Sequence, residues 1–148
     1  MKRYLTLTIA ILMFMAVVTI TADAQVSGSK MSASIPFAFN VGNKTLPAGE
    51  YTVRVVNPSS DRRVLQIRST DGRVSAVIQT IGAALNSANN ADDARLVFHR
   101  YGDTYFFAQA QMAGDSTMLA AVKTNAQRSK ERELASNVRK ATVEIFAE

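Results

Sequence analysis

His99 and the acidic residues are the side chains of this sequence whose types could do chemistry. His99 is the only histidine and cysteine is absent. A His–His or thiolate metal site is therefore unavailable, and a Ser-His-Asp triad would have to use His99. His99 lies in a run typical of a strand, without a nucleophile-elbow motif. We therefore predict no catalytic residue and interpret His99 as structural, with one ring nitrogen hydrogen-bonded.

Metal and phosphate chemistry have little support in the sequence. Asp92 and Asp93 could offer hard oxygen ligands to calcium, but their spacing matches no calcium loop, so we interpret them as loop residues or a helix cap. The seven glycines occur singly, which excludes a glycine-rich phosphate loop. The acidic residues suggest no pair for glycoside hydrolysis. We predict no metal, no cofactor and no enzyme activity.

An aromatic group is the one candidate for ligand binding. A hairpin turning at Gly102-Asp103 would place a set of aromatic and hydrogen-bonding residues on one face: Phe98, Arg100, Tyr105, Phe107 and Gln109. Aromatic platforms ringed by hydrogen-bonding groups can bind sugars or other flat ligands. The alternative, which we favour, is that these aromatic residues pack beneath a helix or a second sheet.

Strands that would carry these residues are indicated by a period of two. The alternating segments are 35–41, 51–56, 64–69, 74–79, 96–101, 104–109, 117–123 and 143–146. Pro36 cannot donate to a strand ladder, so we place the first segment at an edge. A type I′ turn at Asp71-Gly72 predicts Ile67 opposite Ala76, with Leu65 opposite Ile78.

The second hairpin is predicted around Gly102-Asp103, with a type II′ turn. Counting outward pairs His99 with Phe106 and Val97 with Ala108 on one face. Phe98 pairs with Phe107 and Leu96 with Gln109 on the other, so both faces are partly apolar.

The remaining segments complete the predicted fold. Residues 82–94 lack a sustained period and predict a long surface loop. Residues 125–140 predict a helix with a thin apolar stripe of Leu134, Val138 and Ala141. We expect an all-β fold, an antiparallel sandwich or partly open barrel of about seven or eight strands with one C-terminal helix.

The N-terminus has the pattern of a signal peptide. Lys2 and Arg3 precede an apolar run over 5–20, and Ala22-Asp23-Ala24 fits an A-x-A site, which predicts cleavage before Gln25. A retained membrane helix is the less favoured alternative. We expect a signal peptide over 1–24, a single domain over 25–148, and a secreted or periplasmic protein.

The charge balance says little about partners. The chain has 17 basic and 12 acidic residues, a net charge of +5 at pH 7. The basic residues of segment 125–140 alternate with Glu131 and Glu133, which favours a solvated helix face over binding to nucleic acid or lipid. The remaining partner classes are an envelope polymer, a glycan or another protein. Membrane contact is expected only if the signal peptide stays uncleaved.

Four motifs together resemble a known family. They are Phe39-Asn40-Val41-Gly42, Leu46-Pro47-Ala48-Gly49-Glu50-Tyr51-Thr52-Val53, Phe98-His99-Arg100-Tyr101-Gly102-Asp103, and a tail with Ser129 and Glu131-Arg132-Glu133-Leu134-Ala135. In this combination the chain is similar to a family of small secreted bacterial β-rich proteins that has no assigned activity. The resemblance implies a β architecture and secretion.

The sequence therefore favours a non-catalytic secreted or periplasmic β module with a binding or structural role. One alternative is a carrier of a small apolar ligand in a barrel interior, which would require a continuous internal cavity. The other is a hydrolase, which would require His99 in a pocket beside a serine or an aspartate.

Overall fold

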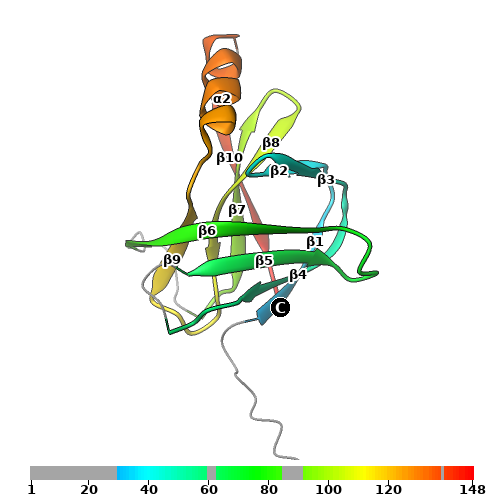
Figure 1. Ribbon diagram of the computed structural model, residues 1–148, viewed down its shortest axis with the longest axis vertical. Coiled ribbons are helices and arrows are strands. Elements are labelled where there is room, and N and C mark those ends of the chain that lie inside the picture. The colour runs from blue at the N-terminus through cyan, green and yellow to red at the C-terminus, as the bar shows by residue number, and fades with distance from the viewer. Residues whose placement is uncertain (1–29, 60–62, 85–91, 138) are drawn as a thin grey trace, which may run out of the picture.

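The computed structural model describes residues 30–59, 63–84, 92–137 and 139–148, which form ten strands and one helix (Figure 1). The strands are β1 (Lys30–Ile35), β2 (Phe39–Val41), β3 (Lys44–Leu46), β4 (Gly49–Val55), β5 (Val64–Ser69), β6 (Ser75–Ala84), β7 (Arg95–Tyr101), β8 (Thr104–Gln111), β9 (Thr117–Ala121) and β10 (Lys140–Phe146). The helix α2 spans Asn125–Asn137. The predicted signal peptide and Gln25 lie outside the described residues, as does most of the loop predicted over 82–94.

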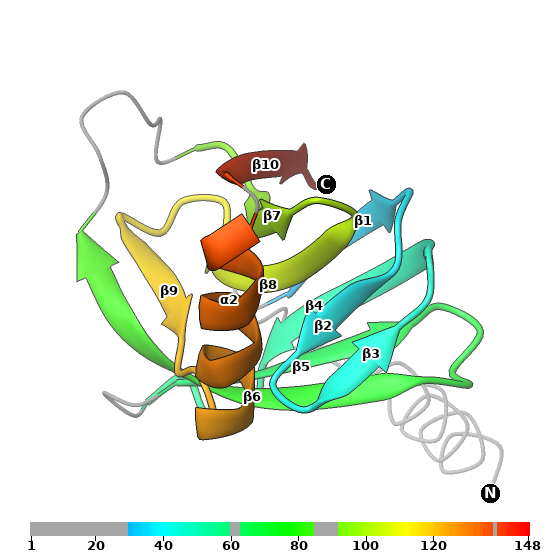
Figure 2. The same cartoon turned by 90° about the horizontal axis from the view of Figure 1, so that it is seen from above.

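One continuous open sheet contains all ten strands. Strands β1, β4, β5 and β6 follow one another, and β6 passes from β5 to β9, which leads to β8, β7 and β10. The β2–β3 hairpin joins β8 through a short parallel pairing. The sheet curls around the core with α2 outside it (Figure 2). Its β1 and β10 ends approach each other, where Ser32 and Glu148 exchange two backbone hydrogen bonds of 2.7 and 2.9 Å.

The predicted fold class, all-β with one C-terminal helix, is confirmed. The core lies inside the curled sheet, where alternate strand residues are buried. Its largest fully buried side chains are Tyr51, Phe39, Phe98, Phe106, Phe107, Ile35, Leu46, Leu65, Ile67, Leu96, Met112 and Leu119. The sheet has two strands more than the eight predicted segments, because β1 and the three-residue β3 were not predicted.

The strand predicted over 35–41 is interrupted. Strand β1 ends at Ile35, immediately before Pro36, and β2 begins at Phe39. Proline has no backbone N–H to donate, so the ladder ends there. Ile35 and Phe39 are nevertheless both buried, so the alternation correctly indicated which residues face the core.

The β5–β6 hairpin has the predicted register but a different turn. Ile67 lies opposite Ala76 and Leu65 opposite Ile78. The Gly72 N–H donates to the Ser69 carbonyl at 2.8 Å. Gly72 has a φ of +74°, and no non-glycine described residue has a positive φ. A type I′ turn needs positive φ at both central residues, so the predicted turn type is wrong.

The β7–β8 hairpin agrees with the prediction near its turn. Gly102 has the positive φ, +59°, that a type II′ turn requires at its first central position. His99 pairs with Phe106, and Phe98 pairs with Phe107, as predicted.

Beyond those pairs the predicted register is wrong. Val97 lies opposite Gln109 rather than Ala108, and Leu96 lies opposite Ala110. An extra residue in β8 displaces every pair beyond it by one, so Gln109 changes face.

Helix α2 forms where it was predicted but buries different residues. Its buried residues are Gln127 and Glu131, and Leu134 is only half-buried. Val138 lies outside the described residues, and Ala141 belongs to β10 and is exposed, so the predicted apolar stripe does not form. Within the described ranges, no helix is long and apolar enough to span a bilayer.

Candidate functional site

The centre of the predicted aromatic face is part of the core. Phe98 and Phe107 are 0% and 1% exposed. Phe98 makes edge contacts with Phe37, Phe39 and Phe107, with ring centroids 5.3, 5.3 and 5.9 Å away. Burial of these two rings is therefore the alternative that the structure bears out.

The rest of that set does not form one surface. Tyr105 is half-buried and stacks on Phe37, with ring centroids 3.8 Å apart. The Arg100 guanidinium lies 5.6 Å from the Tyr105 ring centroid, and its Nε donates to the Gly102 carbonyl at 2.6 Å. Gln109 faces the other side of the sheet because of the bulge. These contacts hold the β7–β8 turn together.

His99 is half-buried in β7, opposite Phe106. Its Nδ1 is buried and has no hydrogen-bond partner among the described residues, so the hydrogen bond expected at the ring is not made there. Burial lowers the pKa of His99 to about 4, and Lys140 and Lys123 add to the effect while Glu131 opposes it. His99 is therefore neutral at pH 7. No hydrogen bond to serine or aspartate is found for it in the described chain.

A buried polar cluster joins α2 to the segment that connects it with β9. Glu131 is 6% exposed and its Oε2 accepts from Lys123 Nζ at 2.5 Å, while Oε1 accepts from Gln127 Nε2 at 3.1 Å. Burial and Glu131 raise the pKa of Tyr101. Because the carboxylate has its charge partner, we interpret this cluster as a structural contact.

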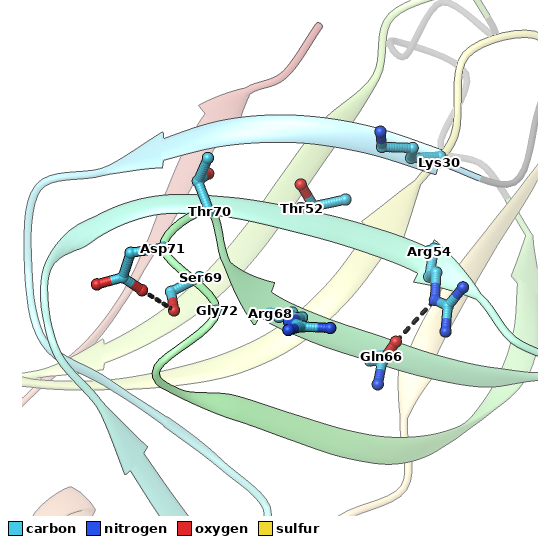
Figure 3. Close-up of a pocket in the computed structure, with 9 residues that line it drawn as sticks. All are labelled: Lys30, Thr52, Arg54, Gln66, Arg68, Ser69, Thr70, Asp71 and Gly72. Carbon is cyan, nitrogen blue, oxygen red and sulfur yellow. Dashed lines mark hydrogen bonds between the residues drawn. The ribbon is translucent and has the colours of Figure 1, made fainter.

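A different face carries the strongest binding geometry. On the outside of β1, β4 and β5, Lys30 lies directly opposite Arg54, and Arg68 lies opposite Thr52 on the next strand. Gln66 lies opposite Arg54. These five side chains, which we call the basic face, line an open hollow of about 460 Å³ together with the Ser69–Gly72 turn (Figure 3).

The cations of the basic face have no carboxylate partner. No acidic oxygen lies within 4.0 Å of the nitrogens of Lys30, Arg54 or Arg68 anywhere in the described ranges. Asp71 also lines the hollow, but it accepts from Ser69 Oγ at 2.5 Å and pairs with Arg73 at 3.4 Å.

Hydrogen bonds to Asp71 also change the pKa of its carboxyl group. The Ser69 hydroxyl and then the Arg73 backbone N–H lower the pKa of its carboxyl group. The carboxylate is thus stabilised by the turn itself.

Sequence reasoning missed this face because it treated the basic residues as scattered. Lys30 lies in β1, which was not predicted, although Met31, Ala33 and Ile35 alternate there with polar residues. That alternation was the signal that could have placed Lys30 in a strand. Its position beside Arg54 depends on pairing between segments that are distant in sequence.

Other hollows lie on the surface of the described residues. Those of about 620, 280 and 580 Å³ are lined mainly by turns, strand edges and α2, and none of them is lined by the core phenylalanines. The interior is filled by the buried side chains given above. Within the described ranges no three histidine, cysteine or acidic residues gather in a way that could hold a metal ion.

Comparison of the chain with family models, curated proteins and solved structures gives no match. The basic face is therefore the feature of the described residues that most directly indicates a function.

Proposed function

We propose that this protein is a non-catalytic binding module, secreted or periplasmic, that holds an acidic polysaccharide of the cell envelope on its basic face. The observation that carries the proposal is the set of three neighbouring cations, Lys30, Arg54 and Arg68, that no carboxylate of the described residues neutralises.

An anionic ligand explains why these charges are adjacent. Like charges directly opposite on neighbouring strands, such as Lys30 and Arg54, destabilise a sheet, by analogy with the roughly 0.2–1 kcal/mol that favourable pairs contribute. A bound anion would reverse this repulsion. Charge-assisted hydrogen bonds contribute about 1.5–3 kcal/mol each, which exceeds that cost.

A sugar polymer fits the remaining groups of the face. Thr52 lies beside Arg54 and Arg68 and offers a hydroxyl, which matches the hydroxyl groups of sugars. The hollow is open to solvent along the sheet, so a polysaccharide chain can lie across it without entering an enclosed cavity (Figure 3). The predicted signal peptide would bring the module to the envelope, where such polymers occur.

The experiment compares two variants that lose the same charge. Polygalacturonate binding is measured by isothermal titration for the wild type, for Arg54→Gln/Arg68→Gln, and for the control Lys130→Gln/Arg139→Gln, which removes two exposed charges elsewhere. We expect the first variant to lose at least about tenfold in affinity, since two charge-assisted contacts disappear. The control should lose less than about threefold, the effect of net charge alone.

Neutral dextran serves as the polymer control and should not bind. Equal losses in the two variants would contradict a localised site, and binding of dextran as strong as that of polygalacturonate would contradict the role of charge.

A further inference from the structure

The guanidinium of Arg54 is held in place by a neighbouring side chain. Arg54 Nε donates to Gln66 Oε1 at 2.7 Å, across the β4–β5 pair (Figure 3). Because Nε is occupied, the two Nη groups form the edge that remains for a ligand. Two parallel N–H donors on one edge match the two oxygens of a carboxylate.

The guanidinium of Arg68 lies against a glycine. A Cβ built on Gly72 would lie 2.9 Å from Arg68 Nη2, 3.6 Å from Nε and 3.7 Å from Cζ. A side chain at position 72 would therefore push this guanidinium away from the turn. Gly72 also has a φ of +74°, which side chains rarely adopt, so the turn depends on glycine and leaves room for the Arg68 guanidinium.

We infer that Gln66 is a positioning residue that orients Arg54, next to Arg68 in the space left by Gly72, for paired recognition of carboxylate groups. This inference rests on the proposed function and goes further, because it assigns the recognised group as the carboxylate of an acidic sugar rather than negative charge in general. Lys30 forms no ion pair with another described residue and ends in a flexible ammonium group, so it contributes attraction without fixed geometry.

The decisive variants keep the charge and remove the planar geometry. Arg54→Lys/Arg68→Lys should lose at least about tenfold in affinity for polygalacturonate, close to the loss in Arg54→Gln/Arg68→Gln, since an ammonium cannot present two parallel donors. The matched control is Arg128→Lys/Arg132→Lys on α2, which should bind as the wild type does. Wild-type affinity in Arg54→Lys/Arg68→Lys would overturn the inference.

A double-mutant cycle tests whether Gln66 acts through Arg54. Gln66→Leu should weaken binding by about fivefold in the wild type, because about 1 kcal/mol of orientation is lost with one hydrogen bond. In an Arg54→Lys background the same change should have almost no effect. Equal losses in both backgrounds would show that Gln66 acts independently of the arginine fork and would overturn its assignment.

Polyphosphate, compared at equal charge concentration, distinguishes the two oxyanions. We expect weaker binding than to polygalacturonate, because polyphosphate has no sugar hydroxyl groups for Thr52 to contact, and tighter binding would contradict the assignment to an acidic sugar. The outcomes also separate the two proposals. If Arg54→Gln/Arg68→Gln binds normally, the proposed function fails, whereas if only the lysine variant binds normally, the paired recognition fails alone.

Discussion

Phe107→Ala tests whether the β7–β8 aromatic residues belong to the core. Phe107 is 1% exposed, and its ring lies 5.9 Å from that of Phe98 at 74°. Truncating a buried phenylalanine costs about 3–5 kcal/mol through lost burial and the cavity left behind. With about 2.1 cal/mol/K of unfolding entropy per residue and roughly 120 residues, a loss of about 3 kcal/mol lowers Tm by about 12 °C.

Urea titration followed by circular dichroism measures this loss, provided that the m-value is unchanged. Phe146→Ala is the matched control, because Phe146 is 67% exposed and the same truncation there should cost less than about 1 kcal/mol. A loss below about 1 kcal/mol in Phe107→Ala would refute the burial and restore the aromatic face as a candidate platform.

The remaining predictions concern titration, helix docking and export. Histidine has an ordinary pKa of 6.5, and the pKa of His99 is about 4 in the folded protein. The unfolded chain therefore binds the proton more readily, and stability falls as pH decreases from 6.5 towards 4. His99→Gln should flatten that part of a stability–pH profile; an unchanged slope would contradict the assignment. Glu131→Ala leaves Lys123 unpaired and should cost about 1–3 kcal/mol in urea titration, against less than about 0.5 for the exposed Glu133→Ala. Equal losses would show that the ion pair is unimportant. Intact-mass measurement of the exported protein should give a chain starting at Gln25, and a mass that includes Met1–Ala24 would rule out cleavage.

The β5–β6 register was predictable because two local signals agree. The Asp71-Gly72 turn and the alternation of apolar residues both place Ile67 opposite Ala76. The type of turn was harder to predict than the register. A longer loop centred on Thr70-Asp71 gives the same strand pairs as a two-residue turn at Asp71-Gly72.

Features that leave no mark in the local apolar pattern were missed or predicted wrongly. No glycine marks the bulge beside Ala108, so counting outward from the turn gave the wrong face for Gln109. Helix α2 buries Glu131, which pairs with Lys123, and a search for an apolar stripe cannot detect a buried ion pair.

The basic face could not be predicted, because it depends on pairing between strands that are distant in sequence. Arg54 and Arg68 lie on adjacent strands that local alternation predicts, but Lys30 reaches them only through the β1–β4 pairing. The residue types were visible in the sequence, whereas their proximity is a property of the folded sheet.

The most direct test of the central claim is an NMR titration of the protein with polygalacturonate oligomers. The account predicts that the side-chain Nε–H signals of Arg54 and Arg68 and the backbone amides around Thr52 and Gln66 shift together in a saturable way, while the signals of α2 stay unchanged. Shifts confined to α2 or to the β7–β8 turn, or none that saturates, would contradict the account.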